Sequence, residues 1–367
     1  MWVRSDQRDS IRLLKASHAN HPHNHQLLRQ LGVVPYQQRF PWIGGDLQTL
    51  RDTLRPVALP ADGGEPIPIA VPALASGAAA AGELLAFLDR PQSSSELPSA
   101  PPRGLVLLLH GLGGSSRREG LRRLGLTLQA NGFAVLRLNL RGADPGRHLA
   151  GGTYAARCNS DLLPVIARAR ALAGDRPLLG AGISLGGTVL LNACLASPGV
   201  LDGLFCASSP LDLAACSASI ERPRNRVYQR WLLKRLVRQT LADPFGVSDE
   251  EEVTLQATPP RSIREFDSAV TAPRWGFADV EAYYREASPM QHLVPACKAM
   301  PPTLLLQALD DPWVPASSAM DLAEALPPEA AIRTLFTPRG GHNGFHGRDG
   351  CWGDQLAAAW LRDVVAG

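Results

Sequence analysis

The chain has 367 residues, a formal net charge of +3 and 45% hydrophobic residues. This length holds one large α/β domain with an insertion, or two domains, and the hydrophobic content suits a sizeable core. So small a net charge gives no reason to expect a nucleic-acid partner. No stretch approaches 18 apolar residues and the first residues lack the apolar core of a signal peptide, so we expect neither secretion nor a membrane span.

The six cysteines are scattered, without C-x-x-C or metal-ligand spacing. We interpret them as reduced thiols of a cytoplasmic protein, several of them buried. Residues 1–39 form a polar arm with four of the nine histidines, at positions 18, 21, 23 and 25. No acidic or cysteine partner nearby completes a closed metal site. We therefore expect a solvated or loosely docked arm, and neither a metal nor an organic cofactor.

The segment before residue 104 has mixed signals. Residues 40–50 are rich in aromatic and apolar side chains, and we expect them to pack against the body of the protein. Residues 55–71 predict two short strands around the turn Asp62-Gly63-Gly64. Residues 73–103 are rich in Ala, Ser and Pro, and predict a surface excursion with one short helix near residues 84–88.

From residue 104 onward, apolar runs alternate with helical segments. Buried parallel strands require continuous apolar runs, which occur at 105–109, 133–140, 177–183, 203–208, 303–309 and 332–336. One helical pattern follows the first run and ends near residue 131, and others cover 155–173, 316–326 and 352–365. This alternation predicts a mostly parallel central sheet flanked by helices, with right-handed crossovers.

Residues 212–300 interrupt the alternation. They lack buried-strand runs and hold two helical regions, 225–242 and 279–285. We interpret them as a helical cap inserted between two parts of the core, 40–211 and 301–367. The stretch 222–238 contains seven basic residues and no acidic one. We expect its helix to pack its apolar side over the sheet edge and solvate its charges, and the alternative is peripheral contact with an anionic membrane surface.

Ser184 lies in Gly182-Ile-Ser-Leu-Gly186, between a predicted strand and a predicted helix. A serine nucleophile needs a strained turn that lifts its Oγ above the sheet, and the glycines let strand and helix backbones approach each other. G-x-S-x-G alone is a weak signal, since a serine in an ordinary turn also produces it. The strand and helix on either side make the signal strong.

A base and an acid follow in the order serine, acid, histidine, each just beyond a predicted strand end. His342 lies in the glycine-rich loop GGHNGF. Asp311 precedes Pro-Trp-Val-Pro and is the favoured acid, while its neighbour Asp310 is the alternative or holds backbone groups. Active sites of open α/β sheets assemble at the carboxyl ends of the strands, so we expect these side chains to meet Ser184.

Two backbone N–H groups are candidates for an oxyanion hole. Leu185 follows the nucleophile at a helix N-terminus, and Leu112 lies in the loop His110-Gly-Leu-Gly-Gly after the first parallel strand. His110 directly ends that strand, so we expect it to orient the loop and not to act as the base.

These residues resemble the YheT-like α/β-hydrolases, also called AB hydrolase family 4, from about residue 40 to the C-terminus. The resemblance rests on WIGGDLQTL, LLLHGLGGSS, FAVLRLNLRG, GISLGG, IREFDSAVTAPRWGF, ALDDPWVP and GGHNGF. It implies an α/β-hydrolase fold with an inserted helical cap, Ser184, Asp311 and His342 as the charge-relay triad, and activity on carboxylic esters. Two histidines often found in relatives are missing, at Gly45-Asp46 and around Gly151-Gly152, which concerns substrate choice and pocket shape.

The sequence therefore predicts a serine hydrolase that cleaves carboxylic esters through an acyl-enzyme on Ser184. A short-chain carboxylesterase or an acylglycerol lipase fits, with a small-molecule or lipid ester as substrate. One alternative is an acyltransferase that passes the acyl group to an alcohol. Another is a catalytically silent binding module, although such proteins usually lose a triad member. We expect a monomer or a weak dimer.

Overall fold

The computed structural model describes residues 22–91 and 101–367. Its centre is an eight-stranded sheet in the order β1-β2-β4-β3-β5-β6-β7-β8. Neighbours from β4 to β8 are parallel, while β2 is antiparallel to both β1 and β4. The strands are β1 Glu65–Val71, β2 Gly82–Asp89, β3 Leu105–Leu109, β4 Ala134–Leu138, β5 Leu178–Ile183, β6 Gly203–Ala207, β7 Thr303–Ala308 and β8 Ile332–Thr337, and a short ribbon follows, β9 His346–Gly347 with β10 Gly350–Cys351.

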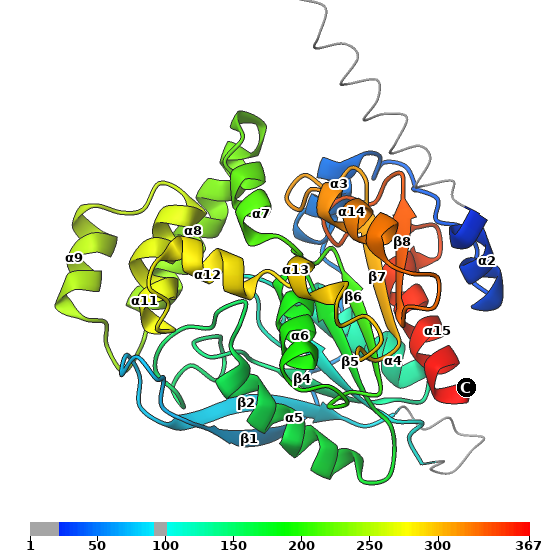
Figure 1. The fold of residues 1–367 in the computed structure, drawn as a ribbon, viewed down its shortest axis with the longest axis horizontal. Helices are drawn as coiled ribbons and strands as arrows, with labels where there is room; N and C mark the ends of the chain where they lie inside the picture. The colour runs from blue at the N-terminus through cyan, green and yellow to red at the C-terminus, as the bar shows by residue number, and fades with distance from the viewer. Residues whose placement is uncertain (1–21, 92–100) are drawn as a thin grey trace, which may run out of the picture.

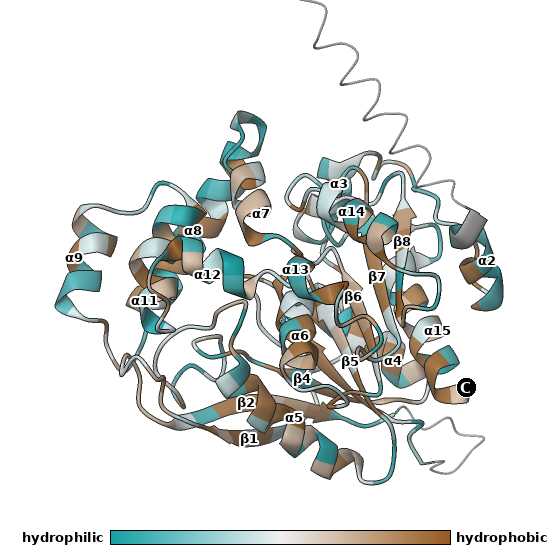
Figure 2. Cartoon of the chain, in the orientation of Figure 1, coloured by the Kyte–Doolittle hydropathy of each residue, from teal (hydrophilic) through white to brown (hydrophobic). Residues whose placement is uncertain are grey.

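Helices cover both faces of this sheet (Figure 1). One face carries α5 (Asn159–Ala173) and α6 (Leu185–Ala196), and the other carries α4 (Glu119–Ala130) and α15 (Trp352–Ala366). Strands β3, β6 and β7 are buried at every residue because helices pack on both sides of them. Figure 2 shows the resulting hydrophobic colour along the central strands. The mostly parallel sheet predicted from the sequence is thus confirmed.

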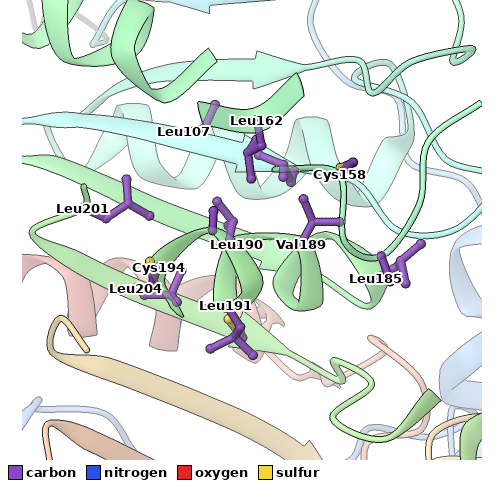
Figure 3. Packing of buried hydrophobic residues seen from close by; sticks show 14 of the residues in the cluster. Leu107, Cys158, Leu162, Leu185, Val189, Leu190, Leu191, Cys194, Leu201 and Leu204 are labelled. Atoms are coloured by element: carbon purple, nitrogen blue, oxygen red, sulfur yellow. The ribbon is translucent and has the colours of Figure 1, made fainter. Parts of the chain in front are cut away.

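Helix α6 lies deep in the core. Its residues 185–194 are all buried, and Figure 3 shows Leu190, Leu191 and Cys194 packed among side chains of neighbouring strands and of α5. A helix that is apolar all round requires such burial on every side. The packing holds the N-terminus of α6, and the turn before it, in one position.

Of the two strands predicted around Asp62-Gly63-Gly64, the second is present as β1 and the first is absent. The expected helix near residues 84–88 is wrong, because this stretch is strand β2, which pairs with β1 and β4. Leu, Ala and Glu in this stretch favour a helix, but packing against the sheet overrides that local preference. The guanidinium of Arg137 on β4 holds Asp89 at the end of β2 (2.5 Å) and Asp62 before β1 (2.6 Å). The serines at 93–95 lie outside the described residues.

The chain between β6 and β7 contains helices only. The two predicted helical regions are present, as α8 and α12, and several short helices come in addition. The helices are α7 Leu213–Ile220, η1 Pro223–Asn225, α8 Arg226–Leu241, α9 Asp249–Ala257, α10 Ile263–Phe266, the π-helical turn η2 Asp267–Thr271, α11 Ala272–Arg274, α12 Val280–Ala287 and α13 Met290–Leu293. Helices α8, α9 and α10 form a buried cluster of their own around Leu232, Leu236 and Phe266, whereas α12 and α13 pack into the core of the sheet.

The N-terminal arm is more firmly docked than expected over its described part. Leu28 of helix α2 (Pro22–Gln30) and Leu31 just after it are buried in the core. The Trp352 indole N–H donates to the Val34 carbonyl at 2.7 Å. His18 and His21 lie outside the described residues. Within residues 22–91 and 101–367, no three His, Cys, Asp or Glu side chains are grouped as a metal site, and no helix is long and apolar enough to cross a membrane. All six cysteines are free thiols, five of them buried.

Candidate active site

Ser184 lies at the tight turn between β5 and α6, with φ 53° and ψ −128°. A serine rarely adopts such a positive φ, so this backbone is strained. A Cβ added at Gly182 would collide with the backbone of Gly187, and one at Gly186 would collide with the carbonyl oxygens of Leu109 and His110. The glycines are therefore needed for the close approach of strand and helix, as predicted.

The structure brings Ser184, His342 and Asp311 together. The Ser184 Oγ lies 2.9 Å from Nε2 of His342, and Nδ1 of His342 lies 2.9 Å from Oδ2 of Asp311. The other carboxylate oxygen of Asp311 accepts the backbone N–H groups of Trp313 (2.8 Å) and Val314 (3.0 Å). Trp313 also stacks on the imidazole, with ring centroids 4.4 Å apart. A proton on Nδ1 leaves Nε2 free to accept the serine proton.

Asp310 has a different partner. Its Oδ1 accepts the backbone N–H of Gly341 at 2.9 Å, directly before His342 in the chain. Burial raises the pKa of Asp310 above its ordinary value. Asp310 thus fastens the loop that carries His342 and does not contact the imidazole, in line with the expectation that it holds backbone groups.

Helix α3 (Gly45–Leu54) braces the same loop, which the sequence analysis did not foresee. Thr49 Oγ accepts the backbone N–H of His342 at 2.8 Å and donates to the carbonyl of Gly45 at 2.7 Å. The side chain of Gln48 is buried and accepts the backbone N–H of His346 at 2.7 Å. The motif WIGGDLQTL contained a hint of this role. Its polar residues lie in a segment that packs against the body of the protein, and buried polar side chains need hydrogen-bond partners.

The N–H groups of Leu112 and Leu185 face no competing acceptor. Neither donates a hydrogen bond to another residue in the described part of the chain. The loop after β3 touches the nucleophile, since a Cβ at Gly111 would lie 2.9 Å from Cβ of Ser184. The Tyr154 hydroxyl accepts the N–H of Gly113 at 2.6 Å and so anchors this loop.

His110 is a buried structural residue. Its Nδ1 lies 2.8 Å from the carbonyl oxygen of Gly111, and its Nε2 accepts the N–H of Leu140 at 3.2 Å. Burial lowers the pKa of His110 to about 4, so the ring is neutral near pH 7. Both nitrogens are engaged, which supports its expected role in orienting the loop.

A cavity of about 760 Å³ opens above Ser184. Its walls come from the sheet edge and from the helices between β6 and β7, with apolar side chains such as Leu213, Ile220 and Leu232. This volume suits a small or medium-sized organic ligand. Asp267 faces the cavity and accepts hydrogen bonds from Thr271 Oγ (2.7 Å) and the Tyr284 hydroxyl (2.9 Å). Burial raises the pKa of Asp267 to about 6.

The first of the two positions at which a histidine is missing has a structural role. Asp46, where relatives often carry histidine, binds the Arg224 guanidinium at 2.9 Å and the Tyr228 hydroxyl at 3.0 Å. These contacts join α3 to η1 and to the start of α8 on the molecular surface.

A mostly parallel sheet with a serine on a strained strand–helix turn defines an α/β-hydrolase. The profile of the family described as serine aminopeptidase, S33, matches residues 100–348. The putative esterase YheT of Escherichia coli is 31% identical over 268 residues, which are 72% of this chain and 75% of that protein. The chain belongs to this family and resembles its YheT-like members.

Two further comparisons give a second relative and a solved structure of the same fold. The mouse phospholipase ABHD3 is 30% identical over 268 residues, which are 72% of this chain and 63% of the mouse protein, so the match spans less than two thirds of that relative. A solved 2,6-dihydroxy-pseudo-oxynicotine hydrolase shares the fold with a TM-score of 0.52 and 16% identity, over 87% of this chain and 72% of that chain.

Proposed function

We propose that the protein is a serine hydrolase that cleaves carboxylic esters. The observation that carries this proposal is the row of two 2.9 Å hydrogen bonds from Ser184 through His342 to Asp311. In the proposed reaction the Ser184 Oγ attacks the ester carbonyl while Nε2 of His342 takes its proton. His342 then returns the proton to the leaving alcohol, and Asp311 stabilises the imidazolium.

The tetrahedral intermediate carries a negative oxygen, and the free N–H groups of Leu112 and Leu185 are its proposed donors. Each such donor typically lowers the barrier by about 3 kcal/mol. Water then attacks the acyl-enzyme, again with His342 as base, and releases the acid. The geometry requires no metal or organic cofactor for these steps.

The proposed substrate is a small-molecule or lipid ester that fits the cavity of about 760 Å³. The names of the two relatives above, a putative esterase and a phospholipase, support an ester. We also propose that residues 212–300 act as a cap over a core formed by 40–211 and 301–367, because the helices of this insertion supply much of the cavity wall. Six free thiols support the proposed cytoplasmic location.

A fluorophosphonate probe together with a series of esters of rising acyl length tests the function. Wild-type protein should be labelled and should hydrolyse at least one ester, and Ser184→Ala should lose both, with turnover falling by about 10⁴-fold or more. Ser197→Ala, at the other end of α6, is the matched control and should behave as wild type. Added ethanol distinguishes hydrolysis from acyl transfer, because transfer produces the ethyl ester in place of the acid.

An unlabelled wild-type protein would contradict the proposal, and so would equal labelling of Ser184→Ala. Either result would favour a catalytically silent binding module.

A further inference from the structure

Arg235 departs from the basic pattern of α8. Arg226, Arg230, Lys234 and Arg238 follow one another at steps of four residues and are exposed to solvent. Arg235 lies outside this stripe and lines the cavity that contains Ser184. Its guanidinium lies over the ring of Trp231, 5.6 Å from the centroid, and Trp231 lines the same cavity.

Arg235 also lies against the loop that carries the proposed oxyanion donor Leu112. A Cβ added at Gly113 would be 3.0 Å from Cδ and 3.2 Å from Nε of Arg235. The Nε atom is buried and has no hydrogen-bond partner among the described residues. Buried donors in proteins normally have an acceptor. The N–H of Arg235 Nε is therefore available to an acceptor on a bound ligand.

Arg118, at the start of α4, also lines the cavity, as does Arg123, which is paired with carboxylates. Partial burial lowers the pKa of Arg118, and the nearby positive charge of Arg238 lowers it further. Across residues 22–91 and 101–367, neither Arg118 nor Arg235 is within ion-pair distance of a carboxylate. Arg118 and Arg238 repel each other, and the buried Nε of Arg235 has no acceptor among the described residues, so an anion bound here would stabilise this arrangement.

The acidic side chains that line the same cavity are already occupied. Asp52 and Asp354 both bind Arg123 at 2.7 Å, and Glu119 lies 3.4 Å from Arg51. Asp267 accepts hydrogen bonds from two hydroxyl groups, as described above. Among the described residues that line the cavity, Arg118 and Arg235 are thus cations without a carboxylate partner, while Asp267 is hydrogen-bonded by hydroxyl groups and not by a cation.

We propose that Arg118 and Arg235 form an anion subsite beside Ser184, which binds a phosphate or carboxylate group carried by the ester substrate. The guanidinium fork gives charge-assisted hydrogen bonds to such groups, and these are stronger in a partly desolvated cavity. The subsite makes negatively charged esters the preferred substrates. This inference rests on the proposed ester hydrolysis, and the experiment separates the two.

The test compares two esters that differ only in charge, 1-butyrylglycerol and 1-butyrylglycerol 3-phosphate. Wild-type kcat/KM should be about tenfold higher for the phosphate ester, as one charge-assisted hydrogen bond provides. The preference should shrink when NaCl rises from about 20 mM to about 300 mM, because salt screens the attraction. This comparison needs no variant and is independent of folding effects.

Variants then assign the preference to residues. Arg235→Gln should bring the ratio of the two kcat/KM values close to one, and Arg235→Lys should retain part of it because the charge remains. Arg226→Gln, in the exposed stripe of the same helix, is the matched control and should keep both the ratio and the turnover of the neutral ester.

Equal kcat/KM for the two esters in the wild type would overturn the subsite, while loss of both activities in Ser184→Ala would still support the hydrolase. An unchanged preference in Arg235→Gln and Arg118→Gln would also overturn it. Inhibition of the neutral reaction by inorganic phosphate, without preference for the charged ester, would indicate a free-anion site and contradict a substrate subsite. Turnover of neither ester together with no fluorophosphonate labelling would overturn both proposals, whereas labelling of Ser184 without turnover of the phosphate ester would overturn the subsite alone.

Discussion

At the scale of single residues, Asp310 and Asp311 show how neighbours with the same chemistry take different positions. Asp311 accepts two backbone N–H groups and points its other oxygen at His342, whereas Asp310 accepts the N–H of Gly341. The sequence favoured Asp311 from the residues that follow it, but the turn geometry after β7 decides which carboxylate reaches the imidazole.

We expect Asp311→Asn to lower kcat by about 10⁴-fold, because the amide no longer holds the imidazole in the right tautomer or stabilises its positive charge. Asp310→Asn keeps an acceptor for the N–H of Gly341 and should lower kcat far less. Steady-state kinetics on one ester, with circular dichroism to verify folding, measures both variants. A larger loss in Asp310→Asn than in Asp311→Asn would refute the assignment of the acid.

At the scale of elements, helix α3 holds the loop that carries His342, almost 300 residues away in the chain. Its residues were expected only to pack, yet Thr49 and Gln48 hydrogen-bond the backbone of that loop. The contact could not be derived from the sequence because it joins a segment before the sheet to one after the last strand.

Thr49→Val removes the acceptor for the His342 N–H while keeping the size and β-branched shape of the side chain. A buried N–H without an acceptor costs about 1–3 kcal/mol, so the loop should shift and kcat should fall by about tenfold or more. Thr127→Val on α4 is the control, since among the described residues the Thr127 hydroxyl bonds to a carbonyl of its own helix, that of Arg123. Wild-type kcat in Thr49→Val would show that α3 does not position the histidine.

Strand β2 is an element whose local sequence predicts the wrong secondary structure. Its sequence GELLAFLD favours a helix locally, and the strand exists because β1 and β4 offer hydrogen-bonding edges on both sides. The parallel strands β3, β5, β6 and β7 were predicted closely, because burial on both faces leaves an unmistakable apolar run.

At the scale of the whole molecule, the sheet and the inserted helices enclose the cavity together. Asp267 belongs to this shared wall, on the π-helical turn of the insertion. Its two hydroxyl partners are neutral, and none of its hydrogen bonds in the described residues comes from a cation. The Asp267 carboxylate is thus buried without a cation to stabilise its charge, and its ionisation lowers the stability of the folded protein.

Burial raises the pKa of Asp267 from 3.8 to about 6, so between these values the folded protein keeps a proton that the unfolded chain has released. Stability supplied by this group is therefore lost as pH rises towards and through 6. Between about pH 5 and about pH 8 the loss amounts to about 1 kcal/mol.

Asp267→Asn should lack this loss, so its free energy of unfolding should gain about 1 kcal/mol relative to wild type over the same interval. Urea unfolding of both proteins at the two pH values measures the difference. The same pH dependence in both proteins would show that Asp267 is not the group responsible.

The sequence alone determined the parallel core, the turn at Ser184 and the prediction of Asp311 and His342 as its partners, because these depend on local patterns: continuous apolar runs, glycines at a close approach, and polar residues at strand ends. Only the tertiary structure decided what surrounds them. The brace from Thr49, the strand β2 and the orientation of Arg235 towards the cavity all depend on contacts between segments far apart in the chain. Such contacts leave no periodic trace in the sequence, since each is made by one or two side chains whose direction is set by packing.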